Sequence, residues 1–160
     1  MGVQRYKRGV SAAGLSMGSG EPLKYAEVVM TSAEVKALRA TPKTLVAAPG
    51  AGRILEFVSG VLFLDAGSNA FTEATANLAV KYANGAGVQV SQTIETTGFI
   101  DQTADMATSA LAKIDAIVAK AAGENQPLVL HNLGAGEIAG NAANDGKLVM
   151  RLCYRVHRTV

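Results

Sequence analysis

Alternation of apolar and polar side chains predicts that the chain ends in a long strand. In KLVMRLCYRVHRTV every second residue is apolar, and this set comprises Leu148, Met150, Leu152, Tyr154 and Val156. The intervening positions hold Val149, Arg151, Cys153, Arg155 and His157. Because successive side chains of a strand point to opposite faces, the pattern predicts one core face and one outward face.

Three earlier stretches also have the period of a strand. RILEFVSGVLFLDAG is apolar at both alternating sets of positions, which predicts one or two strands with a break near Ser59-Gly60, either buried on both faces or packed against a neighbour. NLAVKYANG directs Leu78, Val80 and Tyr82 inward, and its Asn84-Gly85 predicts a hairpin turn into a strand formed by GVQVSQTIE. QPLVLHNL predicts a further strand.

Two segments have the pattern of a helix. Thr31 and Glu34 have the spacing of a capping box, and Pro42 ends the segment, so a helix of two or three turns is predicted at about residues 32–40. Residues 103–121 are rich in alanine, which also favours a helix, with Thr103 and Asp105 as candidate caps. The apolar residues on one face of that helix are Met106, Ala110, Ile114, Ile117, Val118 and Ala121.

Taken together, these elements predict a mainly β fold. The expected architecture is an antiparallel β-sandwich or jelly-roll-like barrel with one or two short helices. Residues 1–24 show neither period and are rich in Gly and Ser, so they predict an extended N-terminal arm that becomes ordered on a partner. A tail without a role is the alternative. Residues 25–160 form a single β-rich body.

The positive charge of the chain is concentrated in that arm. The net charge is +2 overall, whereas residues 1–24 carry +3, from the four basic residues Arg5, Lys7, Arg8 and Lys24 against Glu21. Four cations are too few to predict binding to nucleic acid, and contact with an acidic protein surface accounts for them equally well. Charged residues make up only 18% of the chain, which favours a surface partly covered by partners.

Other compositional features exclude several classes of protein. The single cysteine, Cys153, rules out an internal disulfide and is compatible with assembly in a reducing cytoplasm. No apolar run reaches the length of a membrane span, and the basic start of the chain lacks the apolar core of a secretory signal. We therefore expect no interaction with a membrane.

The glycine-rich stretch AAPGAGR, Ala47–Arg53, does not fit a phosphate-binding loop. A Walker-type loop ends in Gly-Lys-Ser/Thr before a helix, whereas here Arg53 and Ile54 follow Gly52 and begin a predicted strand. The position five residues before Gly52 holds Ala47 instead of glycine. This stretch is therefore predicted to be a turn, with Arg53 as a surface contact.

No combination of residues predicts catalysis or metal binding. His131 and His157 lie in different elements, and Cys153 is too far from His157 along a strand to share one ion with it. Asp101 and Asp105 suit a helix start better than general acid–base chemistry. We therefore expect no enzymatic activity, no cofactor and no metal. Arg151 and Arg155 share a strand face, where they form either an ion-pair row with a neighbouring strand or subunit, or a solvated surface.

The order of the segments resembles capsid decoration, or cement, proteins of tailed bacteriophages. The resemblance starts with MTSAEVKALRATPKTLVAAPGAGRILEFVSGVLFLDAGSNAF and LAVKYANG, and extends through GFIDQTAD, NQPLVLHN and GKLVMRLCYRV. It covers about residues 28–158, and its motifs are structural instead of catalytic. The sequence departs from the family pattern at residues 103–121, because the helix predicted there is not required by a plain jelly roll.

The resemblance implies a structural protein on the outer surface of a phage head, assembled in the host cytoplasm. There it would clamp neighbouring major capsid subunits, as a homo-oligomer with a trimer favoured over a dimer, and without direct contact to nucleic acid. We expect the arm residues Arg5, Tyr6, Lys7 and Arg8 to contact the capsid, and Arg53, Arg151 and Arg155 to contact the capsid or a neighbouring subunit. A head fibre or tail component, or a carbohydrate-binding jelly roll, is the alternative.

Overall fold

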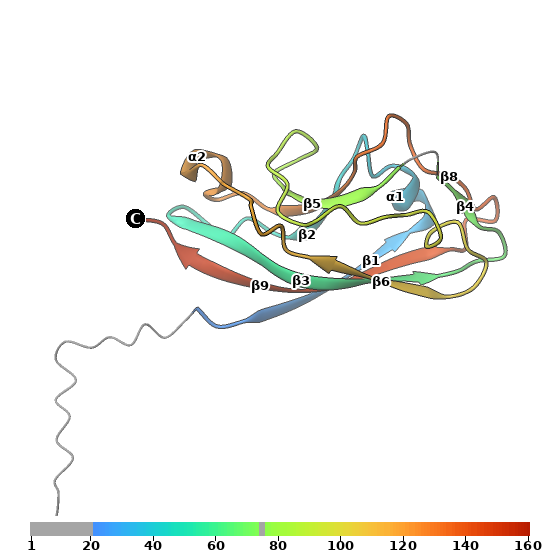
Figure 1. The fold of residues 1–160 in the computed structure, drawn as a ribbon, viewed down its shortest axis with the longest axis horizontal. Helices are drawn as coiled ribbons and strands as arrows, with labels where there is room; N and C mark the ends of the chain where they lie inside the picture. The colour runs from blue at the N-terminus through green and yellow to red at the C-terminus, as the bar shows by residue number, and fades with distance from the viewer. Residues whose placement is uncertain (1–20, 74–75) are drawn as a thin grey trace, which may run out of the picture.

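Two antiparallel sheets pack face to face in the computed structural model, which describes residues 21–73 and 76–160 (Figure 1). The elements in chain order are β1 (Lys24–Thr31), α1 (Ser32–Lys36), β2 (Lys43–Val46), β3 (Arg53–Asp65), β4 (Phe71–Thr72), β5 (Leu78–Tyr82), β6 (Met106–Leu111), α2 (Lys120–Gly123), β7 (Leu128–Asn132), β8 (Ala139–Gly140) and β9 (Lys147–Arg158). The fold is therefore mainly β with two short helices, as predicted.

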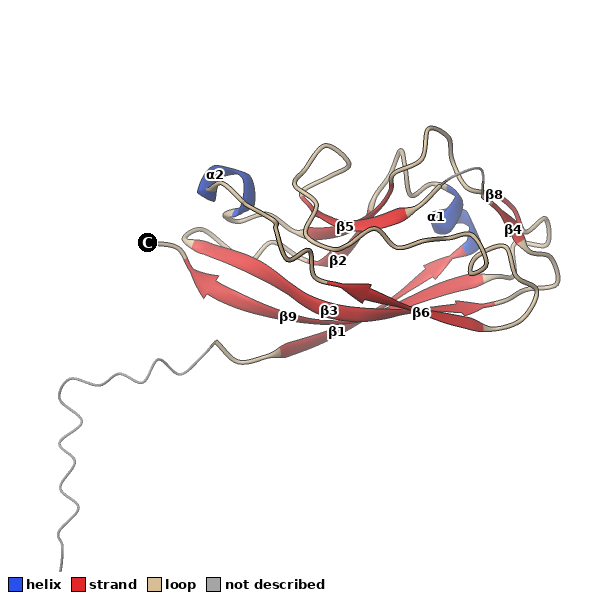
Figure 2. Ribbon diagram, in the orientation of Figure 1, coloured by secondary structure: helices blue, strands red, loops and turns tan. Residues whose placement is uncertain are grey.

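The strand order places the predicted C-terminal strand at the centre of the larger sheet. This sheet has the order β1-β9-β3-β6, the smaller sheet has the order β2-β7-β5, and β4 pairs with β8 apart from both. Figure 2 shows the four long strands as one layer beneath the layer that contains β2 and β5. The arrangement is that of an antiparallel sandwich, while jelly-roll connectivity stays a prediction.

The core lies between the two sheets. On β9 the predicted inward residues Leu148, Met150 and Leu152 are buried, and on β5 the predicted residues Leu78, Val80 and Tyr82 are buried too. Leu128 and Leu130 of β7 contribute from the smaller sheet. The predicted inward positions of β5 and of residues 148–152 in β9 are therefore confirmed, whereas Tyr154 and Val156 are only partly buried and Ala79 of β5 is buried as well.

The strand β3 is continuous, and a bulge accounts for the apolar character of both its alternating sets. Its register against β9 shifts between Phe57 and Ser59, so that Val58 is the extra residue. Before the bulge Leu55 and Phe57 are buried, and after it Leu62 and Leu64 are buried. An extra residue exchanges the inward and outward positions. Burial on both faces is therefore wrong for this segment, because each half of β3 has one core face, whereas the predicted alternative of packing against a neighbour is observed in the pairing with β9 and β6.

The capping box of the first helix is present, but the helix is shorter than predicted. The Thr31 hydroxyl accepts a hydrogen bond from the Glu34 amide, and the Glu34 carboxylate accepts one from the Thr31 amide at 2.9 Å. The α-helix ends at Lys36, and residues 37–40 form a turn before Pro42.

The second predicted helix, at 103–121, was wrong. Residues 106–111 instead form β6, which pairs along β3 from Leu64↔Met106 to Ser59↔Leu111. Pairing with the open side of β3 buries Ala110, and this outweighs the helical preference of alanine. Asp105 caps no helix, because its carboxylate accepts a hydrogen bond from the Ala66 amide at 2.9 Å. Only Lys120–Gly123 is helical, as α2.

The hairpin predicted after β5 is only partly present. Residues 88–94 run beside β5 through isolated bridges, Lys81↔Gln89 and Leu78↔Ile94, and do not form a regular strand. The positive φ of the connection lies at Ala83, at 60°, and not at Asn84-Gly85. Along its other side β5 pairs with β7, far away in the sequence.

Candidate docking surface

The outer face of the four-stranded sheet carries side chains in three rows that cross the strands. The cross-strand register aligns Tyr25, Cys153, Ser59 and Leu111 in one row, and Glu27, Arg151, Val61 and Ser109 in the next. The third row consists of Val29, Val149, Phe63 and Ala107. Among the described residues, none of the other strands lies over this face (Figure 2).

Large apolar side chains are exposed on this face. Tyr25 is 72% exposed, Leu111 59%, and Val29 48%, and Val61 is exposed between them. Leu23, just before β1, is also exposed. Single exposed apolar residues are ordinary on a protein surface, but several on one uncovered sheet face are typical of a binding surface.

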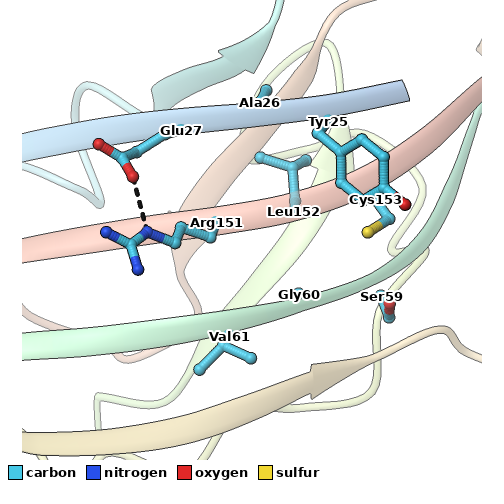
Figure 3. Close-up of a pocket in the computed structure, with 9 residues that line it drawn as sticks. All are labelled: Tyr25, Ala26, Glu27, Ser59, Gly60, Val61, Arg151, Leu152 and Cys153. Atoms are coloured by element: carbon cyan, nitrogen blue, oxygen red, sulfur yellow. Dashed lines mark hydrogen bonds and ion pairs between the residues drawn. The ribbon is translucent and has the colours of Figure 1, made fainter. Parts of the chain in front are cut away.

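A shallow groove of about 430 Å³ runs between the first two rows (Figure 3). Tyr25 and Cys153 line one side, and Val61 and Arg151 line the other. The strand positions between the rows hold Ala26, Leu152 and Gly60, whose side of the sheet faces the core, so backbone forms the floor. An extended apolar segment or a flat side chain fits a site of this shape.

Arg151 is held in place by partners within the same chain. Its Nε donates to Glu27 Oε2 on β1 at 2.6 Å, and its guanidinium lies 5.2 Å from the centre of the Phe63 ring on β3. The alternative of an ion-pair row with a neighbouring strand is therefore the one observed. Because both charged side chains are more than half exposed, the pair adds little stability but fixes the charge pattern of the face.

Arg155 also pairs within the chain, at the far end of β9. Arg155 Nη1 and His157 Nε2 lie 3.3 Å and 2.8 Å from the same Glu56 carboxylate on β3. Partial burial raises the pKa of Glu56, but the hydrogen bonds from His157 and Arg155 outweigh it and leave the pKa below its usual value. This carboxylate therefore stays ionised and balances the positive charge of Arg155.

Arg53, by contrast, has a like charge as its neighbour. It begins β3 directly opposite Arg158 of β9, and Lys24 lies close to both around a small surface hollow. Among residues 21–73 and 76–160 no carboxylate forms an ion pair with any of these three cations. This end of the sheet has more basic than acidic side chains, with Glu21 as the one carboxylate that lines the hollow, and it adjoins the residues that precede β1.

The AAPGAGR stretch connects β2 to β3 and crosses from one sheet to the other, as the turn that was predicted. Gly50 and Gly52 have positive φ values of 95° and 71°. Their amides donate to Asn125 Oδ1 at 2.9 Å and to Glu124 Oε1 at 2.7 Å. Since side-chain oxygens of Asn125 and Glu124 occupy these two donors, the loop is tied to the segment after α2.

The remaining predicted contacts, Arg5, Tyr6, Lys7 and Arg8, lie outside the described residues. Within residues 21–73 and 76–160 no three His, Cys, Asp or Glu side chains are grouped to hold a metal ion. No described helix is long and apolar enough to cross a membrane.

Sequence reasoning missed Tyr25, Val29, Val61 and Leu111 as members of one surface. Tyr25 and Val29 lie in a stretch that was not assigned as a strand, and Leu111 was placed on a helix. The alternation of Tyr25, Glu27 and Val29 was the available signal. In the comparisons with known proteins, neither the protein-family models nor the curated proteins gave a match to this chain.

Proposed function

We propose that this chain is a structural virion protein that binds the outer surface of a tailed-bacteriophage capsid. It cements neighbouring major capsid subunits and so stabilises the DNA-filled head. The observation that carries the proposal is the uncovered outer face of the four-stranded sheet, with its exposed apolar residues and its groove. Residues 1–23 lead directly into β1 at the edge of this face, so both parts of the chain can reach one partner surface.

The chemistry of the face suits a protein partner. Burial of Tyr25, Val29 or Leu111 would each contribute roughly 1.5–3 kcal/mol at most, which is modest for one copy. A specific interface needs roughly 1,000 Å² or more, and that area requires the arm or a neighbouring copy in addition to the face. Many copies on a fixed lattice then multiply weak contacts. A homo-oligomer, with a trimer favoured, fits this requirement.

The basic end of the sheet would set the orientation of the chain on its partner. Lys24, Arg53 and Arg158 extend the positive charge of the first 24 residues onto the body. An acidic strip on the major capsid protein would pair with both at once, and such complementarity steers association and sets orientation. The proposed partner surface is therefore apolar at its centre and acidic at one end.

Binding to capsids tests the proposal. Shells of the phage that encodes the chain, stripped of this protein, are mixed with the full chain and with a chain that lacks residues 1–20. We expect the full chain to co-sediment with the shells and the truncated chain to show lower occupancy. Full occupancy by the truncated chain would rule out the arm as a clamp, and failure of the full chain to bind would overturn the proposed function.

A further inference from the structure

A second pocket lies on the outer side of the three-stranded sheet, away from the groove. It has a volume of about 740 Å³, and basic side chains from three elements line it. Lys81 comes from β5, His131 from β7, and Arg39 from the turn after α1. The register pairs Lys81 with Val129 and Ala79 with His131, so Lys81 and His131 are diagonal neighbours on one face of the sheet.

The Arg39 and Lys81 cations of this pocket have no ion-pair partner among the described residues, and burial lowers the pKa of Lys81. Arg39 Nη1 donates to the Gly134 carbonyl, and Lys81 Nζ donates to the Gly85 carbonyl. Glu137 is the single carboxylate that lines the pocket. Its oxygens accept hydrogen bonds from the backbone amides of Arg39 and Ala40, at 3.0 Å and 2.8 Å.

The His131 imidazole is affected by the positive charge around it. The side chain is 8% exposed, and its Nδ1 atom is buried without a hydrogen-bond partner among the described residues. Burial lowers the pKa of His131, and the charges of Lys81 and Arg39 lower it further. The Arg39 backbone and the Glu137 carboxylate act in the opposite direction, but more weakly. The net field at the ring therefore favours an added negative charge.

Gly85 packs directly against the His131 ring at one wall of the pocket. A Cβ atom at position 85 would overlap the His131 imidazole, with Nε2 as its nearest atom. Any side chain there would displace the ring from its position. The contact with His131 therefore requires a residue without a side chain at position 85. A tight turn does not impose this requirement, since Gly85 has no positive φ.

We propose that this pocket binds a small oxyanion, a carboxylate or phosphate group, held by Lys81 and Arg39 beside His131. Hydrogen bonds from a cation to an oxyanion are among the strongest in proteins, and here they would neutralise two charges that lack a carboxylate partner. The bound negative charge favours the protonated imidazole, so binding and protonation of His131 are linked. The proposal does not depend on the capsid function, because the pocket and the groove lie on opposite sheets.

An NMR titration tests the site directly. Inorganic phosphate and, separately, acetate are added at constant ionic strength made up with chloride, while the pKa of His131 and the amide signals of Gly85 and Gly136 are followed. We expect a saturable shift of the amides and a rise in the pKa of His131. Saturation by phosphate alone assigns a phosphate ligand, and saturation by acetate as well assigns oxyanions in general.

Two variants with matched charge changes identify the residues involved. Lys81→Gln removes one cation of the pocket, and Lys113→Gln removes a lysine of a surface loop that pairs with Asp115. We expect Lys81→Gln to weaken binding by roughly tenfold or more, the value of one charge-assisted hydrogen bond, and Lys113→Gln to leave it unchanged. Shifts that follow chloride equally well, or that never saturate in the unaltered chain, would overturn the site. Equal binding by the two variants would also overturn it.

Discussion

The two sheets of this sandwich differ in how many of their faces are covered. All five residues of β7 and four of the five residues of β5 are buried, because loops and the turn after α1 cover the outer side of the smaller sheet. In β1, only Met30 is buried. Among residues 21–73 and 76–160, the larger sheet therefore places one face in the core and leaves the other uncovered. Both sheets contribute side chains to the core, but only the larger sheet has an outer face that the other described elements leave exposed.

The largest difference in the free energy of unfolding between the two regions is expected when a core leucine is truncated. Leu130→Ala in β7 removes a fully buried side chain and should lower the free energy of unfolding by about 2–5 kcal/mol. The matched change on the uncovered face, Val61→Ala, should cost about 0.5 kcal/mol or less. Urea denaturation of both variants measures the difference. Similar losses would mean that the outer face is packed in solution.

A pair of tyrosines allows the same comparison for one hydroxyl group. The Tyr82 hydroxyl is buried and donates to the Leu55 carbonyl, and burial followed by the Glu56 charge raises its pKa to about 12. Tyr82→Phe leaves that carbonyl unpaired and should cost about 1–3 kcal/mol. Tyr25→Phe changes an exposed ring and should leave the unfolding midpoint in place. If Tyr82→Phe left the free energy of unfolding unchanged, the hydrogen bond from the Tyr82 hydroxyl to the Leu55 carbonyl would not be formed.

The pH dependence of stability should report on His131. Its pKa in the folded protein lies below the ordinary value of 6.5, so the unfolded chain binds the proton more readily. The contribution of His131 to the free energy of unfolding is therefore fully present above pH 6.5. It declines as the pH falls through 6.5 toward the lower pKa of the folded protein. His131→Asn should flatten this part of the profile, measured by thermal unfolding from pH 7.5 to 5 in steps of about half a unit. An unchanged slope would assign the dependence to other groups.

The smallest effect is expected from the ion pair on the uncovered face. Glu27 and Arg151 are both more than half exposed, so a double-mutant cycle with Glu27→Gln and Arg151→Gln should give a coupling of about 0–1 kcal/mol. Binding to a partner surface should respond more strongly than stability does, because the pair sets the charge pattern beside the groove. A coupling well above this range would indicate that the face is shielded from water.

The sequence predicted the fold best where one face of an element meets the core. The strand β9 was predicted with its inward residues because strict alternation over about a dozen positions matches the period of a strand and not that of a helix. The Thr31–Glu34 capping box was found because its contacts are local. In both cases neighbours in the chain carry the information.

Where the sequence failed, partners far along the chain decide the structure. Residues 106–111 have helical propensity, but they form a strand because they pair with residues 59–64 of β3. The bulge at Val58 depends on register with β9, which no local pattern specifies. The outer face combines residues from four strands, and the pocket at Arg39, Lys81 and His131 joins elements about 40–50 positions apart. Neither has a linear motif.

Occupancy on capsids most directly tests the claim that the uncovered face is the docking surface. The double variant Tyr25→Ser/Val29→Ser changes the face, and the matched control Ile114→Ser/Ile117→Ser changes two isoleucines that are 95% and 91% exposed in the loop after β6. Both variants should fold as the unaltered chain does. We predict that the face variant loses most of its binding to stripped shells and that the loop variant keeps it. Retained binding by the face variant, with loss by the loop variant, would contradict the account.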